Sequence, residues 1–266
     1  MDKIGKYKIK PFTTNRKNIV LVAREGHRKL KIDCLLELDV TDARRRMHEM
    51  KAKGQDVSFT GWIVKCLAQA VSEHPAMNSY RQGRSKLVVF EDVDIPITIE
   101  RTIDDDIRPL VHIIRQAHAK TLSEITSEIR SVQHEAATTG AQVLGTPLTR
   151  FERFVLAAPV WVKRLFIGLY RNKGLSRKKH FGTVAVTAIG MKGRFPGWVI
   201  PLGGPVTTLV AVAGITTKPG VVKDAVVPRE FLHLTLTVDH AVIDGGPLTR
   251  FIERFTQLVE SASFIG

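Results

Sequence analysis

The sequence predicts an α+β fold in which helices flank a mixed β-sheet. Two observations carry this prediction. Segments with the apolar alternation or the apolar runs typical of strands are interspersed with segments whose apolar residues recur at helical spacing. The two kinds of segment do not alternate regularly, as they would in repeated βαβ units. No internal repeat or low-complexity linker divides the 266 residues, so a single domain covering residues 1–266 is expected.

Helices are predicted from apolar spacing and from the residues that end them. Thr41 or Asp42 would accept the first free N–H groups of the second helix, and Gly54 would end it. The third helix stops before Pro75, and Thr121 or Ser123 caps the fourth. The expected helices cover residues 16–29, 43–54, 58–72, 121–135 and 247–262.

Strands are predicted where β-rich apolar segments are bounded by turn residues. They are expected at residues 31–40, 86–101, 107–114, 183–190, 207–216 and 231–240. A loop is expected at residues 138–146. The strand pattern returns from Thr183 to the end of the chain, after the segment that precedes it.

The chain has an excess of positive charge, which a negatively charged partner or another feature of the protein has to explain. Forty Lys and Arg residues against 26 Asp and Glu give a net charge of +14. Anionic lipid, nucleic acid and polyanionic small molecules would all be attracted. No zinc-finger spacing or other nucleic-acid-binding signature occurs, so a nucleic-acid partner is not expected. The histidines show no metal-ligand spacing either, and no metal is expected.

The location of the protein is predicted from what the sequence contains. No stretch reaches the roughly 18 uncharged apolar residues of a membrane span, and the basic N-terminus is not followed by the apolar region of a secretory signal. Cys34 and Cys66 lie in apolar surroundings and are expected to be buried free thiols. A cytoplasmic protein is therefore predicted.

Residues 141–181 are expected to be an insert. Residues 154–170 are largely apolar and are flanked by basic residues. One interpretation is a helix in the core or at a subunit contact. The other is a segment that rests on an anionic membrane surface through residues 150–180, with Trp161, Phe166 and Leu169 entering the headgroup region.

The densest chemical signal is the segment from Leu236 to Gly246. A β-rich run ends in His240, and the turn Asp244-Gly245-Gly246 follows. An imidazole at a strand end can face a cleft and take a proton from a thiol or hydroxyl. Asp244 could orient the loop through a hydrogen bond or salt bridge. Strand alternation places His233 on the opposite face, outside this site.

The segment around His240 and several upstream segments resemble a known family. The segment TVDHAVIDGGPLTRFIERFTQLVE is similar to the C-terminal active-site segment of the dihydrolipoyl acyltransferase catalytic domain of 2-oxo acid dehydrogenase complexes, in the chloramphenicol acetyltransferase-like superfamily. The resemblance continues upstream in GTVAVTAIGM, PVTTLVAVAGI and SFTGWIVKCLAQAVSEHPAMN, and in residues 93–109 and 120–129. It covers most of residues 10–140 and 182–262 and implies a two-layer fold.

The resemblance also implies a mechanism. His240 would be the general base for a thiol or hydroxyl that attacks an acyl-coenzyme A thioester, and Thr187 would donate a hydrogen bond to the oxyanion. Asp244 would hold the active-site loop, with Arg16 or Lys17 as its partner. In the family the active site lies between subunits of a trimer, so a homotrimer or a larger multiple of trimers is expected.

Two departures from the family pattern bear on function. Ala241 stands where the family usually has an arginine after the histidine, and no lipoyl domain precedes the core. The resemblance implies coenzyme A as a substrate, and because of the second departure no lipoyl group is expected to be bound covalently to this chain. The family has no short phosphate-loop signature, so no pocket residues are predicted.

Three functions stay open from the sequence. The first is a free-standing coenzyme A-dependent acyltransferase. The second is the core acyltransferase of a 2-oxo acid dehydrogenase complex, acting on dihydrolipoamide supplied by a lipoyl-bearing partner chain. The third is a non-catalytic trimeric scaffold, against which His240 and Asp244 argue.

Overall fold

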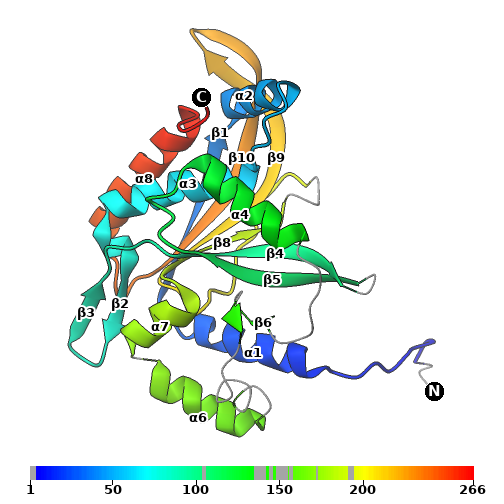
Figure 1. Ribbon diagram of the computed structural model, residues 1–266, viewed down its shortest axis with the longest axis vertical. Coiled ribbons are helices and arrows are strands. Elements are labelled where there is room, and N and C mark those ends of the chain that lie inside the picture. Colours follow the sequence, from blue (N-terminus) through cyan, green and yellow to red (C-terminus); the bar gives the residue numbers. More distant parts are fainter. Residues whose placement is uncertain are drawn as a thin grey trace.

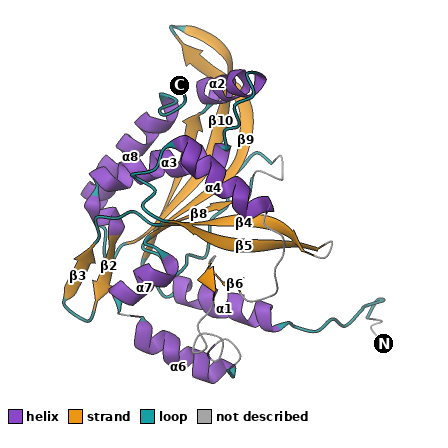
Figure 2. Cartoon of the chain, in the orientation of Figure 1, coloured by secondary structure: helices purple, strands orange, loops and turns teal. Residues whose placement is uncertain are grey.

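A computed structural model of the chain describes residues 4–103, 106–134, 142–143, 146–147, 155, 158–171, 173–190 and 195–266. These residues form the predicted α+β fold. A six-stranded mixed sheet lies at its centre, with strand order β1-β10-β9-β8-β4-β5 (Figures 1 and 2). β8 runs parallel to both of its neighbours, β4 and β9, and the other pairs are antiparallel.

The elements follow the predicted order. The sheet contains β1 (Lys31–Asp39), β4 (Ile95–Ile103), β5 (Asp106–Ile114), β8 (Val184–Ala188), β9 (Thr208–Val222) and β10 (Ala225–Asp239). Outside it lie the pairs β2 (Ser79–Gln82) with β3 (Lys86–Val89), and β6 (Gln142–Val143) with β7 (Thr146–Pro147). The helices are α1 (Thr14–His27), α2 (Thr41–Ala52), α3 (Phe59–Glu73), α4 (Leu122–His134), α6 (Val160–Tyr170), α7 (Gly174–Phe181) and α8 (Gly245–Glu260), with a short 3-10 turn, η1 (Pro75–Asn78).

Two predicted segments differ from the structure. The strand expected over 86–101 is divided, because residues 90–94 turn between β3 in the small sheet and β4 in the central one. The loop expected at 138–146 contains β6 and the first residue of β7, and its remaining residues lie outside the described ones. Short pairs of this kind carry too little apolar pattern to be recognised in a sequence.

The hydrophobic core lies between one face of the sheet and helices α3, α4 and α8 (Figure 1). α3 is buried along most of its length, and the side chains of Trp62, Ile63 and Leu67 are fully covered. It begins where the Ser58 side chain accepts a hydrogen bond from the Gly61 N–H at 3.1 Å. α4 begins with a reciprocal pair, in which Thr121 and Glu124 each accept the backbone N–H of the other. Of the two caps predicted for α4, Thr121 is therefore the one used.

The start of α2 differs from the prediction. Neither Thr41 nor Asp42 caps it; instead Asp39 accepts the Thr41 N–H at 3.0 Å. The helix ends at Ala52, and Gly54 follows in a left-handed conformation with φ of 78°. Both thiols are free, and Cys66 is buried as expected, whereas Cys34 is only half-buried.

The other face of the sheet is polar near its centre and is covered by the segment that precedes β9. Trp198 of that segment donates to the Leu36 carbonyl at 2.9 Å and packs edge-on against His233. Gly214 lies at a bulge where β9 opposes β10, and a Cβ there would fall 2.0 Å from the Phe195 carbonyl oxygen. A glycine is required at this position so that the covering segment can approach the sheet.

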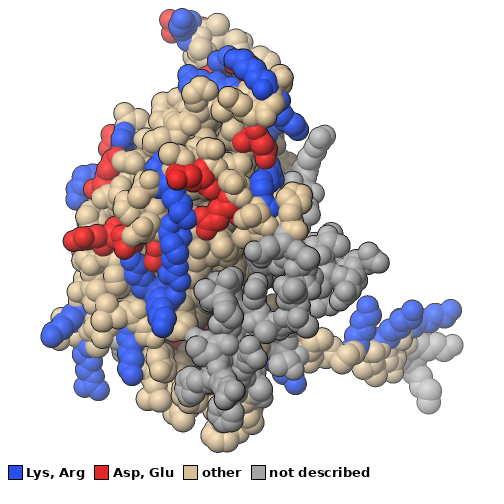
Figure 3. Space-filling view, viewed as in Figure 1, with Lys and Arg blue, Asp and Glu red and all other residues tan. Residues whose placement is uncertain are grey.

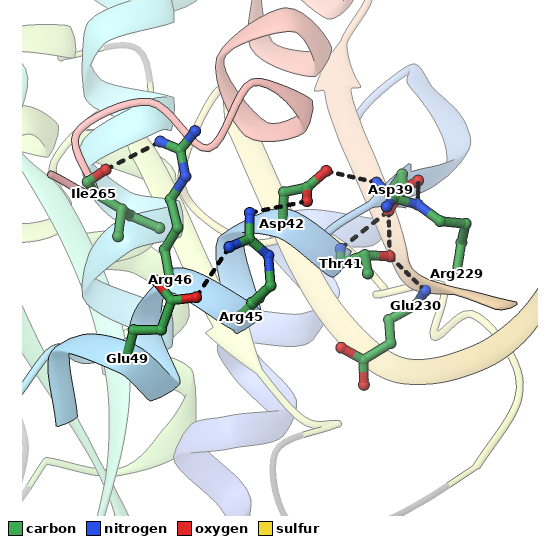
Figure 4. Close-up of polar contacts among 9 residues, drawn as sticks. All are labelled: Asp39, Thr41, Asp42, Arg45, Arg46, Glu49, Arg229, Glu230 and Ile265. Atoms are coloured by element: carbon green, nitrogen blue, oxygen red, sulfur yellow. Dashed lines mark hydrogen bonds and ion pairs between the residues drawn. The ribbon is translucent and has the colours of Figure 1, made fainter. Parts of the chain in front are cut away.

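A long hairpin formed by β9 and β10 extends past the sheet (Figure 1). Its turn places Lys223 and Asp224 at positive φ. Arg229 joins the hairpin to the β1–α2 junction, donating to Asp39 at 2.6 Å and to Asp42 at 2.7 Å (Figure 4). Glu230 adds a main-chain bond to the Thr41 hydroxyl at 2.7 Å. Thr41 and Asp42, the residues expected to cap α2, therefore bind the hairpin instead.

Charged side chains are distributed over the surface. On the face seen in Figure 3, lysine and arginine side chains occur at several separate places, with acidic side chains between them. Among the described residues, no helix combines the length and apolar character needed to cross a bilayer.

The contacts of Arg229 predict a pH dependence of stability. The pKa of Asp42 lies below its ordinary value because Arg229 donates to it; at Asp39, burial alone would raise the pKa, but the hydrogen bonds from Arg229 and Thr41 outweigh it. A carboxyl with a lowered folded pKa stabilises the fold above its unfolded pKa of about 3.9, and this stability is lost as the pH falls through the folded value. The unfolding free energy of Arg229→Met should therefore fall less steeply below pH 4.

Urea denaturation between pH 2.5 and 6 measures this effect. Arg84→Met, at an exposed position between β2 and β3, is the control and should keep the wild-type slope. An Arg229→Met protein with the wild-type slope would show that Asp39 and Asp42 do not depend on Arg229.

Candidate functional site

His240 lies where the central strand β10 leaves the sheet. Its main-chain N–H donates to the Leu30 carbonyl at 2.7 Å, directly before β1 begins. The side chain is exposed in the single chain. β10 ends here because Asp239 accepts the N–H groups of both Val242 and Ile243, at 2.9 and 3.0 Å, which closes a turn. The prediction that His240 stands at a strand end before a turn is confirmed.

The orientation of the imidazole defines its chemistry. Its Nδ1 lies 2.9 Å from the Ile243 carbonyl oxygen. A carbonyl can only accept, so Nδ1 carries the proton, and in the neutral ring Nε2 holds the free electron pair. The ring is therefore held in the tautomer that offers Nε2 as a base.

Thr187 lies on a different part of the same sheet. In β8 it pairs with Ala211 of β9, which pairs with Thr235 of β10. Thr235 precedes His240 by five positions, or about 16 Å along the strand, and two strand spacings add about 10 Å sideways. Thr187 and His240 of one chain are thus roughly 19 Å apart. One chain does not bring them together.

Asp244 is the residue before α8 and is exposed. Its main-chain carbonyl accepts from Leu248 at 3.1 Å. Within the described residues its side chain forms no ion pair with Arg16 or Lys17. Those two residues lie on the first turn of α1, and the other end of that helix leads to Leu30 beside His240, about 15 Å further along the helix axis. The predicted partner is therefore not met within one chain.

Two residues beside His240 were not singled out in the sequence. Lys29 donates to the Val206 carbonyl, and its Nζ lies 4.0 Å from Asp239. Burial, together with the nearby Arg177, lowers the pKa of Lys29 to about 7, against the opposing effect of Asp239 and Glu25. Asp239 also accepts the Ala241 N–H at 3.2 Å. No local pattern marks a lysine as buried, because lysines are usually solvated.

His233, which was predicted to lie outside the site, has a separate set of contacts. It is buried, and its Nε2 lies 3.2 Å from Glu37 while its Nδ1 lies 3.0 Å from the Gly214 carbonyl oxygen. Thr235, two positions further along, is also buried, and its hydroxyl has no partner among the described residues. These groups belong to the polar face of the sheet and not to the turn that carries His240.

Neither of the two best-formed hollows of the described residues includes His240. One lies within the β9–β10 hairpin and the other between α1 and α6. The described residues also contain no cluster of three or more His, Cys, Asp or Glu side chains that could hold a metal ion. In one chain, the predicted base is therefore an exposed imidazole outside both of these hollows.

The fold defines a class of protein. Solved structures with the same fold include a probable dihydrolipoamide acetyltransferase from Listeria monocytogenes, with a TM-score of 0.70, 22% identity and coverage of 98% of this chain and 97% of that one. The cubic core of a pyruvate dehydrogenase multienzyme complex has a TM-score of 0.69 and 18% identity, with coverage of 97% of this chain and 93% of that one. Chloramphenicol acetyltransferase has a TM-score of 0.50 and 15% identity, with coverage of 95% of this chain and 98% of that one. The expected superfamily fold is confirmed.

The chain belongs to the family of 2-oxoacid dehydrogenase acyltransferase catalytic domains, whose model matches residues 5–143 and 167–265. The unmatched residues 144–166 lie inside the expected insert, whose wider bounds of 141–181 stay a prediction.

Curated relatives agree with this assignment. The lipoamide acyltransferase component of the branched-chain alpha-keto acid dehydrogenase complex of Bacillus subtilis is 25% identical over 233 residues, which are 85% of this chain and 46% of the relative. A probable dihydrolipoyllysine-residue succinyltransferase component of the mitochondrial 2-oxoglutarate dehydrogenase complex of Schizosaccharomyces pombe is 25% identical over 214 residues, 79% of this chain and 39% of the relative. The chain thus spans less than half the length of these two relatives.

Proposed function

We propose that this domain transfers an acyl group between coenzyme A and an acceptor thiol or hydroxyl, with His240 as the general base. Membership of an acyltransferase family supports the reaction class. The observation that carries the proposal for this chain is the hydrogen bond between His240 Nδ1 and the Ile243 carbonyl, because it leaves Nε2 free to take a proton.

The reaction follows from that geometry. Nε2 accepts the proton of the acceptor thiol, and the sulfur attacks the thioester carbonyl as a new C–S bond forms. The tetrahedral oxyanion then accepts a hydrogen bond from the Thr187 hydroxyl. When the bond to the coenzyme A sulfur breaks, Nε2 returns the proton to the departing thiolate. No acyl-enzyme intermediate is needed.

The site is proposed to combine two chains. The sheet register separates Thr187 from His240 by roughly 19 Å in one chain, so a hydroxyl from a neighbouring subunit must reach the imidazole. The exposed position of His240, outside the two best-formed hollows of the described residues, supports the same conclusion. We infer a homotrimer or a larger multiple of trimers in which Asp244 holds the active-site loop, with Arg16 or Lys17 of the neighbouring chain as its partner.

A solved relative supports these roles. In the dihydrolipoamide acetyltransferase of Azotobacter vinelandii, a serine, a histidine and an asparagine have been investigated for roles in the catalytic mechanism. There the serine precedes the histidine by 52 positions and the asparagine follows it by four. Here Thr187 precedes His240 by 53 positions and Asp244 follows it by four.

The acceptor is the remaining choice. The relatives named above are components of 2-oxo acid dehydrogenase complexes, so a dihydrolipoyl group carried on a partner chain is the first acceptor to test. Ala241, in place of the family's usual arginine, keeps a small acceptor of a free-standing enzyme as the second.

Removal of the base should abolish the reaction. His240→Ala should lower kcat by about 1,000-fold, since general base catalysis contributes about 100- to 10,000-fold. Release of free thiol from acetyl-, succinyl- and branched-chain acyl-coenzyme A measures it, with dihydrolipoamide and a panel of small thiols and alcohols as acceptors. His48→Ala, on an exposed position of α2, is the control. Wild-type turnover that survives in His240→Ala would contradict the proposed base, and no turnover with any pair in an assembled oligomer would favour the scaffold.

A mixing experiment tests whether the site lies between subunits. Thr187→Ala alone should lower kcat by about 100-fold. When His240→Ala and Thr187→Ala subunits are unfolded together and refolded as mixed oligomers, some interfaces combine an intact His240 with an intact Thr187. Activity should return in the mixture but not in either parent. If the site lay within one chain, every subunit would keep one defect and the mixture would stay inactive.

A second proposal concerns the surface of α6. Trp161, Leu165 and Leu169 are 69%, 58% and 59% exposed and follow one another at four-residue spacing, which places them on one face of the helix. The opposite side packs on α1, where the buried Lys163 donates to Asn18 at 2.9 Å. Phe166, expected on the exposed face, is half-buried.

We propose that this exposed row rests on an anionic membrane surface. Arg164 and Lys173 are exposed beside it, and cations around an apolar helix face favour anionic headgroups. A second copy of α6 on the same face would bring like charges together, which argues against a contact between identical copies.

Vesicle flotation tests the α6 surface. Wild type should float with vesicles that contain phosphatidylserine and not with pure phosphatidylcholine, and Leu165→Glu should weaken binding at least tenfold. Val226→Glu, at a 72% exposed position of the hairpin, is the matched control. Equal binding by Leu165→Glu, or no flotation by wild type, contradicts the proposal. A Leu165→Glu protein that loses its oligomeric state would instead identify the row as a subunit contact.

A further inference from the structure

A buried polar link connects Lys29 to the turn that carries His240. Lys29 lies between α1 and β1, and its side chain and that of Asp239 are only 13% and 15% exposed. Its ammonium donates to the Val206 carbonyl and lies 4.0 Å from one oxygen of Asp239. The other oxygen of Asp239 accepts the Ala241 N–H. His240 therefore lies between Asp239, which carries this carboxylate, and Ala241, whose main-chain N–H is bonded to it.

Asp239 is the centre of that turn. Its main-chain N–H donates to Thr207 at 3.0 Å, and its main-chain oxygen receives both Val242 and Ile243. The Ile243 carbonyl in turn accepts from the His240 ring. A shift of Asp239 would therefore move the acceptor that holds the imidazole, and Lys29 is the cation that faces the free side of the carboxylate.

The surroundings of Lys29 oppose its charge. Arg177 of α7 faces it and donates to the Pro205 carbonyl, next to the Val206 carbonyl that Lys29 uses. The two acidic groups near it are Asp239 of β10 and Glu25 of α1, and Glu25 is already bonded to Arg28 and Arg171 at 3.1 and 2.9 Å. A lysine that is buried beside an arginine loses its proton far more readily than a solvated lysine.

We propose that Lys29 is a positioning residue for the transfer reaction: its ammonium holds Asp239, and through Asp239 the turn that aims His240, and the hold is released when Lys29 loses its proton. The inference rests on the proposed function of His240. It goes beyond that function because it makes the activity at alkaline pH depend on the protonation state of Lys29.

The pH–rate profile tests the inference. Because burial lowers the pKa of Lys29 to about 7, kcat of wild type should fall as the pH rises from 7 to 9. Lys29→Met should lose this alkaline limb and lower kcat about tenfold at pH 7, with KM for acyl-coenzyme A unchanged. Lys29→Arg keeps a cation that does not titrate in this range, so its kcat should stay level to pH 9. Lys86→Met, an exposed lysine of β3, should match wild type.

A second readout is independent of activity. In wild type, hydrogen-exchange protection of the peptide that contains residues 239–244 should decrease from pH 6 to 9 after correction for the intrinsic rate; in Lys29→Met it should be low and constant. The folded pKa is below the unfolded value of about 10.4, so the unfolded chain binds more protons between pH 7 and 10 and Lys29 makes stability rise with pH there. Lys29→Met should lose that rise while staying folded.

The outcomes separate the two proposals. An enzyme inactivated by His240→Ala whose alkaline limb and turn protection are unchanged by Lys29→Met overturns the role of Lys29 alone. Wild type without transfer activity overturns the proposed function, and the exchange experiment then still decides whether Lys29 holds the turn.

Discussion

The pairing of β10 between β1 and β9 is the constraint on which the site depends. The strand is bonded along both edges, so its register is specified twice, and a slip of one residue would exchange its core leucines for its polar face. The last bond on the β1 side joins His240 to Leu30, where the chain turns from α1 into β1. The candidate base is therefore placed directly after a strand that is paired along both edges.

The same register separates the two groups that the proposed reaction uses, Thr187 and His240. β8 is short and parallel to β9, so Thr187 is level with Thr235 and not with the end of β10. Under the proposed mechanism, a domain that keeps its hydroxyl and its imidazole at different places on a sheet can unite them only across a contact between copies. The proposal therefore makes activity depend on assembly.

Electrostatics add to this frame in two ways. Around Arg229, acids and bases pair at partly exposed positions and tie the hairpin to α2, which stabilises the fold (Figure 4). Around Lys29, burial and a neighbouring arginine work against the charge, while the carboxylates of Asp239 and Glu25 support it. Interactions of the second kind stabilise little, but they respond to pH near neutrality and lie beside reactive groups. Lys29 lies beside Asp239, the residue that precedes His240, so its charge acts next to the candidate base.

The sequence by itself determined the fold class, nearly every strand and helix of the central sheet and its helical cover, and the place of His240 at a strand end. Those features follow from local apolar spacing and turn residues, which are written in consecutive positions. Only the tertiary structure decided the cap of α2, where Asp39 acts and the expected Thr41 and Asp42 serve the hairpin, and the half-buried state of Cys34. It also showed that, within the described residues of one chain, Asp244 forms no ion pair with Arg16 or Lys17, that Thr187 is distant from His240, and that Lys29 is buried beside Asp239. Each of these depends on which segments distant in the chain become neighbours, and no local pattern encodes the register of one strand against another.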